Sequence, residues 1–130
     1  MLFKILYQFS IVLMLPIWIM YWSYSHIKYK IPLGRLKERI GFLSAQLPKN
    51  AIWIHAVSIG ELKLAKLLIQ NLPSNTPIVI STISGHGFEK HIDAPHFYLP
   101  IDLIWSIRKT MRFLKPSALV LIETEIWPCL

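Results

Sequence analysis

Hydrophobic residues follow two different patterns along the chain. From Ile5 to Ser25 no residue is charged, and most side chains are large and apolar. After residue 50, short apolar runs alternate with stretches in which apolar residues recur about every 3.6 residues. The first pattern is typical of a segment that enters a membrane, and the second of a domain in which strands and helices alternate.

The second pattern predicts four strands separated by helices. The expected strands lie at 51–56, 77–81, 96–99 and 118–122, and the expected helices at 61–72, 88–91 and 103–114. Alternating elements of this length form a parallel sheet with crossover helices. We therefore expect an α/β fold with a Rossmann-like parallel-sheet domain at 51–130 and a basic juxtamembrane linker at 26–50.

The uncharged run is long enough to cross the hydrocarbon core, which takes about 20 residues. Aromatic residues gather toward its end, as at a membrane interface: Trp18, Tyr21, Trp22 and Tyr24. We predict an uncleaved membrane anchor at 1–25. A cleaved signal peptide is one alternative, although its apolar core would be shorter and would end in small residues. A buried or interfacial helix is the other.

Positive charge is concentrated just after the apolar run. The chain has a formal net charge of +7, and five of its cations are Lys28, Lys30, Arg35, Lys37 and Arg39. Because the side richer in Lys and Arg stays cytoplasmic, we expect the rest of the chain in the cytoplasm. These five cations are expected to face anionic headgroups, with a solvated linker as the alternative.

Two other features of the charge pattern limit the partners. A second basic group lies on a helical pattern and is either a solvated helix face or a second membrane-facing patch: Arg108, Lys109, Arg112 and Lys115. Nucleic acid is not expected as a partner, because no recognisable module is present and the charge lies beside the apolar run. The lone Cys129 has no partner for an internal disulfide, which agrees with a reducing compartment. No Cys or His spacing is typical of a metal site.

Polar residues follow the predicted strands where each strand ends. They are Ser58, Gly60 and Glu61 after the first strand, Thr82, Ser84 and Gly85 after the second, Asp102 after the third, and Glu123 and Glu125 after the fourth. Ligands of open α/β sheets bind beyond the carboxyl ends of the strands, so these residues are the candidate site. For Glu61 a capping role in the first helical turn is the alternative, since the helix dipole favours a carboxylate there.

Four segments of the sequence resemble one enzyme family. The segments are Arg-Leu-Lys-Glu-Arg-Ile-Gly-Phe at 35–42, His-Ala-Val-Ser-Ile-Gly-Glu at 55–61, Tyr-Leu-Pro-Ile-Asp at 98–102, and Glu-Thr-Glu-Ile-Trp-Pro at 123–128. In this order and spacing they resemble 3-deoxy-D-manno-octulosonic acid (Kdo) transferases. The segment at 81–87 departs from the Thr-rich pattern expected of the family, although Ser84 keeps a hydroxyl.

The resemblance implies a function and roles for individual residues. It implies a GT-B glycosyltransferase on the cytoplasmic face of the bacterial inner membrane, which transfers Kdo from CMP-Kdo to a lipid A precursor without a metal or other cofactor. By resemblance, Glu61 is the general base, and Glu125 with Glu123 supports it or orients substrate.

The resemblance also implies that the 130 residues hold only the acceptor domain of such an enzyme, and hold it incompletely. We therefore expect the N-terminal part of a truncated or split transferase, which is inactive without a separately encoded donor domain. A non-catalytic, membrane-anchored remnant or binding module is the alternative.

Overall fold

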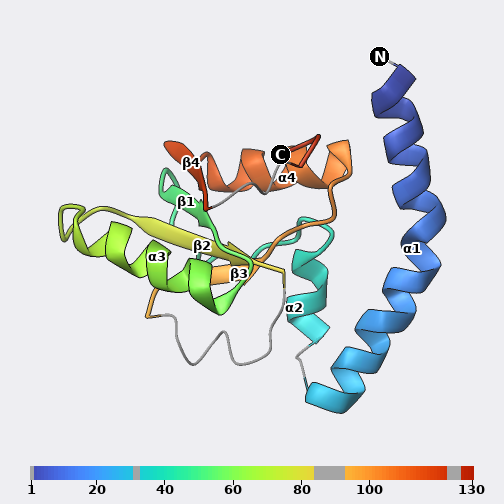
Figure 1. Cartoon of the computed structure of the whole chain (residues 1–130), viewed down its shortest axis with the longest axis horizontal. Helices are drawn as coiled ribbons and strands as arrows, with labels where there is room; N and C mark the ends of the chain where they lie inside the picture. Colours follow the sequence, from blue (N-terminus) through green and yellow to red (C-terminus); the bar gives the residue numbers. More distant parts are fainter. Residues whose placement is uncertain (1, 31–32, 84–92, 123–126) are drawn as a thin grey trace.

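The computed structural model describes residues 2–30, 33–83, 93–122 and 127–130. Its elements in chain order are α1 (Leu2–Tyr29), α2 (Leu33–Glu38), β1 (Ile52–His55), α3 (Ile59–Gln70), β2 (Ile78–Thr82), β3 (His96–Tyr98), α4 (Ile104–Leu114) and β4 (Ala118–Leu121). Figure 1 shows α1 as a long helix beside a domain that contains the other elements.

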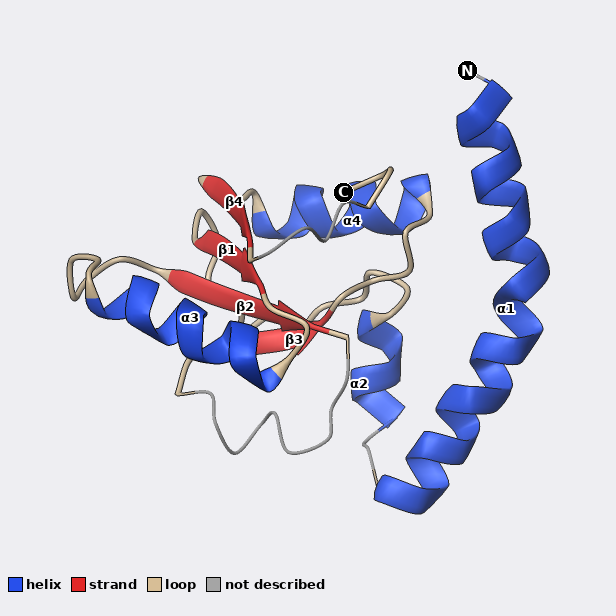
Figure 2. Ribbon diagram, in the orientation of Figure 1, coloured by secondary structure: helices blue, strands red, loops and turns tan. Residues whose placement is uncertain are grey.

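The four strands form one parallel sheet in the order β3-β2-β1-β4. Helices α3 and α4 lie on its two faces (Figure 2). Neighbouring residues of β1 belong to two different clusters, because successive side chains of a strand point to opposite faces. Trp53 packs in the cluster that includes Leu114 of α4, and Ile54 in the one that includes Leu62 of α3. The predicted α/β fold with a parallel sheet is confirmed, while the helix expected at 88–91 lies outside the described residues.

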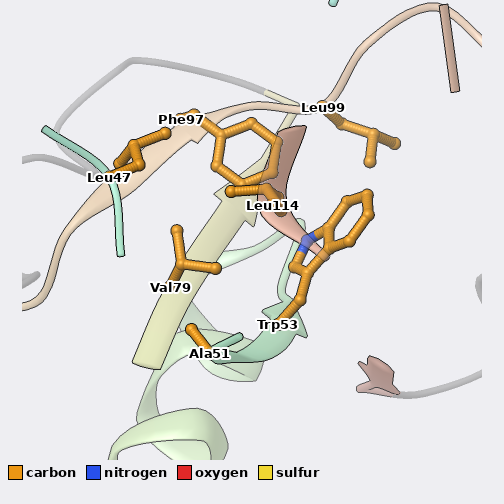
Figure 3. Close-up of a cluster of buried hydrophobic side chains, with 7 residues drawn as sticks. All are labelled: Leu47, Ala51, Trp53, Val79, Phe97, Leu99 and Leu114. Carbon is orange, nitrogen blue, oxygen red and sulfur yellow. The ribbon is translucent and has the colours of Figure 1, made fainter. Parts of the chain in front are cut away.

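The core on the α4 side is centred on Trp53. Figure 3 shows its seven buried side chains: Leu47, Ala51, Trp53, Val79, Phe97, Leu99 and Leu114. The ring centroids of Trp53 and Phe97 are 5.4 Å apart at a tilted angle. The indole N–H of Trp53 donates to Ser81 Oγ at 2.7 Å, so its polar atom is paired within the core. This packing fixes the strand ends that carry the candidate site.

The segment expected to be a linker contains α2, which packs on the edge strand β3. Glu38 accepts a hydrogen bond from the backbone N–H of Tyr98 at 2.7 Å, and Arg35 donates to the carbonyl of His96 at 3.2 Å. Arg35 and Glu38 are also 3.6 Å apart as an ion pair. An edge strand has one row of backbone groups without a strand partner, and α2 supplies side chains for them. Sequence periodicity does not reveal this contact, because the paired residues are about 60 positions apart.

We predict that Glu38→Ala destabilises the domain by about 1–3 kcal/mol. The change leaves the Tyr98 N–H without its carboxylate acceptor, and removing the acceptor of a buried donor costs about that much. Chemical denaturation of the detergent-solubilised chain measures the change. Lys37→Ala on the exposed side of α2 is the matched control and should shift stability by less than about 0.5 kcal/mol. Equal effects of the two variants would contradict the edge-strand role.

Helix α1 is tied to the domain by polar side chains near its N-terminus. Tyr7 Oη donates to Asp102 Oδ2 at 2.8 Å. Gln8 Nε2 donates to the carbonyl of Asp102 at 3.0 Å, and Gln8 Oε1 accepts from the N–H of Ile104 at 3.0 Å. In the described residues, Phe3–Tyr29 is the one helix long and apolar enough to cross a membrane, with a mean hydropathy of 1.7. Buried helices and signal sequences share those properties, so this is weak evidence of a membrane span.

Candidate functional site

The first part of the candidate site is the turn from β1 into α3. Ser58 is the N-cap of α3, with an extended backbone, and its hydroxyl accepts a hydrogen bond from the N–H of Glu61 at 3.1 Å. Ser, Thr, Asp and Asn are favoured at this position because their side chains satisfy a free N–H of the first turn. Ser58 and Gly60 are both exposed to solvent. The cap therefore leaves an open polar rim where β1 ends.

Glu61 is held at this rim through one oxygen of its carboxylate. Its Oε2 accepts a hydrogen bond from the N–H of Val57 at 2.7 Å, and the side chain is 6% exposed. This closely resembles a capping box, in which the third helical residue reaches back to the start of the helix. Oε1 has no hydrogen bond within the described part of the chain. The structure thus shows the helix-capping contact that was the alternative role for Glu61. It leaves Oε1 free to act on a ligand.

Two neighbours of Glu61 were also predicted to bind substrate. In the sheet register Ser81 lies opposite His55, so Thr82 follows directly beside the end of β1, and it is buried. At Gly60 an added Cβ would meet Ser58 Oγ at 3.7 Å, which is ordinary contact. The fold itself does not need a glycine at residue 60. A ligand that approaches the first turn of α3 closely would give a reason for one.

His55 is a buried polar residue of this region that sequence reasoning did not single out. Its Nδ1 lies 2.8 Å from Ser81 Oγ, whereas Nε2 has no hydrogen-bond partner. Burial lowers the pKa of His55, and the nearby Glu61 carboxylate only partly opposes this effect. The imidazole is therefore neutral at pH 7. The sequence did contain a signal for this residue, since a histidine is the last residue of an otherwise apolar strand.

Asp102 is buried, whereas we expected it to be open to solvent at the end of the third strand. It is 3% exposed, and its carboxylate accepts hydrogen bonds from Tyr7 Oη and from the N–H of Cys129. The residue thus joins α1, the start of α4 and the C-terminal segment. Its partners are 95 and 27 positions away, which explains why the sequence pattern did not reveal this arrangement.

The five cations predicted to face a membrane fall into two groups. Lys28, Lys30 and Lys37 are exposed. In contrast, the guanidinium groups of Arg35 and Arg39 turn toward the domain and lie over the ring of Tyr98, at 4.9 and 4.5 Å from its centroid. A planar guanidinium stacks on an aromatic ring more readily than an ammonium group. This part of the prediction therefore differs from the observed geometry.

Four further candidates cannot be placed, because they lie outside the described residues: Ser84, Gly85, Glu123 and Glu125. The described site consists of Glu61 with Ser58 and Gly60 at an open rim, and Thr82 beside them. A fixed carboxylate with a free oxygen is suited to accept a proton from a hydroxyl group. In the described part of the chain, no three His, Cys, Asp or Glu side chains are grouped to hold a metal ion.

Comparison with known proteins identifies relatives of this chain. Residues 34–130 match the family described as 3-deoxy-D-manno-octulosonic-acid transferase (kdotransferase). The chain is 36% identical over 105 residues to the 3-deoxy-D-manno-octulosonic acid transferase of Haemophilus influenzae, an alignment that covers 72% of this chain and 24% of the relative. It is 33% identical over 120 residues to the transferase of the same name from Chlamydophila psittaci, with 84% of this chain and 27% of the relative covered.

A plant relative extends the comparison beyond bacteria. A probable mitochondrial 3-deoxy-D-manno-octulosonic acid transferase of Arabidopsis thaliana is 32% identical over 117 residues, which cover 79% of this chain and 26% of the relative. The chain thus spans about a quarter of the length of the curated relatives it matches. The family match includes the whole described sheet domain and all of α2 except its first residue. The chain therefore belongs to the 3-deoxy-D-manno-octulosonic-acid transferase family.

Proposed function

We propose that this chain is the acceptor-domain part of a lipid A Kdo transferase. In this proposal a GT-B enzyme transfers Kdo from CMP-Kdo to a lipid A precursor, with the acceptor on this domain and most of the donor on a second Rossmann-like domain. The observation that supports it best is Glu61, whose carboxylate is fixed at an open rim with one oxygen free. The rim lies within the family match at residues 34–130.

The proposed chemistry is proton removal from an acceptor sugar hydroxyl. As the hydroxyl oxygen attacks the anomeric carbon of Kdo, Glu61 accepts its proton, and CMP leaves from that carbon. Such base catalysis requires the carboxylate within hydrogen-bond reach of the hydroxyl, at about 2.6–3.2 Å. The exposed Ser58 and Gly60 lie beside Glu61 and are proposed to contact the acceptor, together with Thr82. The contact of Glu61 with Val57 holds the carboxylate in one orientation.

Other residues have roles that rest on the family alone. Glu125, with Glu123, is proposed to orient substrate or to support the base, and Ser84 and Gly85 to contact substrate. Asp102 was predicted to bind substrate, and its bonds to Tyr7 and Cys129 favour a positioning role for the loop between β3 and α4.

We further propose that α1 attaches the chain to a membrane. Its outer face is apolar and exposed, with Phe3, Phe9 and Leu13 each at least 67% exposed, while Tyr7 and Gln8 face the domain. The exposed Lys28, Lys30 and Lys37 would interact with anionic headgroups. The proposed compartment is the cytoplasmic face of the bacterial inner membrane. A mitochondrial membrane is the alternative, because the Arabidopsis relative is named as mitochondrial.

Topology gives a direct test of this attachment. We predict that a reporter fused after Leu130 is active only on the cytoplasmic side, because the basic residues after the apolar run stay there. A reporter at the N-terminus tests whether α1 crosses the bilayer. The hydrogen bond from Tyr7 to Asp102 requires both residues on the same side, so both reporters should be cytoplasmic. A periplasmic reporter after Leu130 would contradict the proposed location of the domain.

Supplying a donor domain to this chain in cells tests the function. The chain and the whole part of the Haemophilus influenzae relative that follows the 24% it matches are expressed together in cells depleted of their own Kdo transferase. Recovery of Kdo-bearing lipid A, measured by mass spectrometry of extracted lipid, is expected only when both are present. If neither the two separate parts nor a covalent fusion of them yields Kdo-bearing lipid A, the chain is a non-catalytic remnant or binding module.

A further inference from the structure

Arg39 directly follows α2 and reaches the carboxyl ends of two strands. Its Nη1 donates to the carbonyl of Leu99 at 3.2 Å, and its Nη2 donates to the carbonyl of Ile83. The register of β2 and β3 ends with the pair Thr82 and Tyr98, so these two carbonyls belong to the first residues after the paired strands. One side chain thus connects two strand ends, at the same end of the sheet as the rim.

Three further contacts fix the position of Arg39. Its guanidinium carbon lies 4.5 Å from the centroid of the buried Tyr98 ring. Its backbone carbonyl accepts a hydrogen bond from the N–H of Ile101 at 2.8 Å, and its N–H donates to the carbonyl of Leu36 at 3.1 Å. A planar guanidinium presents its N–H donors in a fixed fork, so it can hold two acceptors at a defined separation. Arg39 is therefore a fixed link between α2 and the loops after β2 and β3.

Stability alone does not explain a cation at this position. Burial lowers the pKa of Arg39 to about 10, an effect that the nearby Glu38 carboxylate partly opposes, so the side chain stays protonated at pH 7. Its Nε is buried without a hydrogen-bond partner, which lowers stability. An apolar side chain of similar size could pack on Tyr98 without either cost. Only the donation to two carbonyls specifically requires an arginine here.

The link acts on the end of β2, where the proposed function places Thr82 at the acceptor site. The carbonyl of Thr82 accepts a hydrogen bond from the N–H of Leu99 at 2.8 Å, and the next residue, Ile83, is bound by Arg39. Strand β2 also pairs with β1, whose carboxyl end leads to Glu61. A displacement of the end of β2 would therefore move Thr82 relative to the Glu61 carboxylate.

We propose that Arg39 is a positioning residue for the candidate site. Its two side-chain hydrogen bonds hold the ends of β2 and β3 together and so keep Thr82 in a fixed place at the rim. Arg39 itself touches no substrate in this proposal. The consequence for acceptor binding rests on the proposed function, whereas the link between the strand ends does not.

Hydrogen exchange of single amides, measured by NMR on the full chain in mild detergent, tests the link. In Arg39→Met the apolar side chain still packs on Tyr98 but donates no hydrogen bond. We expect the amide of Leu99 to exchange at least about tenfold faster, since a hydrogen bond to a charged group contributes about that factor or more. The amide of Ile52, bound to the carbonyl of Pro77 at the other end of the sheet, should change by less than about threefold. A merely structural role would accelerate both amides in parallel.

Arg35→Met is the matched control. Arg35 lies over the same Tyr98 ring, at 4.9 Å, but it donates to the carbonyl of His96, at the end of β3 that lies away from the rim. This variant should leave the ratio of the two exchange rates within about threefold of that in the unmodified chain. Arg39→Lys keeps the charge but has a single ammonium group in place of the planar fork, so it should resemble Arg39→Met.

Kinetics of the two-part enzyme test the consequence for the acceptor. The chain is combined with the part of the Haemophilus influenzae relative that follows the 24% it matches. Arg39→Met should raise KM for the lipid A precursor at least about tenfold and leave kcat within about threefold, as when a contact made equally in the ground and transition states is lost. If no combination yields product, the proposed function fails, while the exchange rates still decide the role of Arg39.

Three results would overturn the link between the strand ends. They are parallel acceleration of the Leu99 and Ile52 amides, equal effects of Arg39→Met and Arg35→Met, and normal exchange in Arg39→Lys. In an active two-part enzyme, an unchanged KM in Arg39→Met would overturn the effect on the acceptor. Circular dichroism reports whether Arg39→Met folds, and if it does not, the exchange rates of Arg39→Lys decide the proposal.

Discussion

The 130-residue chain alone is expected to transfer no Kdo from CMP-Kdo to a lipid A precursor. It covers about a quarter of the length of its relatives, and the proposed donor domain is not among these residues. Holding two reactants in a reactive geometry contributes up to about 7–11 kcal/mol to lowering a barrier. An acceptor domain alone cannot supply that contribution, however well Glu61 is placed.

The measurement uses purified chain in detergent with both substrates, followed by mass spectrometry of the lipid. Addition of the separately purified remainder of the Haemophilus influenzae relative, which follows the 24% that this chain matches, should restore product. A covalent fusion of the two parts should be more active than the mixture, because it raises the effective concentration of the donor domain. Product from the chain alone would show that a complete site exists within these residues and would overturn the half-enzyme proposal.

The sequence predicted the two central strands because they are buried on both faces. Ala51–Ala56 and Pro77–Ser81 were expected from their apolar runs, and β1 and β2 lie inside them or within one residue. In the structure these two strands are central, and their side chains pack under both α3 and α4. Burial on two faces gives continuous apolar runs, which are recognisable without knowledge of the partners.

The contacts between the N-terminal region and the domain could not be predicted in this way. Arg35 and Arg39 read as membrane-facing cations, because nothing local shows that Tyr98 and the β3 edge lie beside them. Tyr7 and Gln8 lie in an uncharged, mostly apolar run, and nothing near them in the sequence indicates a contact with the domain. Their partners around Asp102 are more than 90 residues away, so these contacts depend on the tertiary fold.

The rim at the end of β1 was predictable in position but not in detail. The change from apolar strand to Ser58, Gly60 and Glu61 is visible in the sequence. The bond from the Val57 N–H to Glu61 shows the capping role, and we propose the base role for the same side chain. These roles use different oxygens of the carboxylate. Only a measurement that records stability and rate together can therefore separate them.

Glu61→Gln in the reconstituted two-part enzyme is expected to reduce kcat by about 10²–10⁴-fold, which is typical for the loss of a general base. The amide keeps the shape of the side chain, and its carbonyl oxygen still accepts the N–H of Val57. The effect on stability should therefore be limited to the lost charge at the helix N-terminus, about 0.3–1 kcal/mol. Steady-state kinetics and chemical denaturation of the same preparations measure both quantities.

The matched control for this variant is Lys63→Gln, which changes a charge on the exposed face of α3 two residues later and should leave kcat unchanged. A pH profile adds a further distinction, because a base that must be ionised gives an acidic limb in kcat that the glutamine variant should lack. If Glu61→Gln keeps near-normal kcat and loses only stability, Glu61 is a helix cap. The proton acceptor would then have to be sought among the other strand-end residues, with Glu125 the first to be tested.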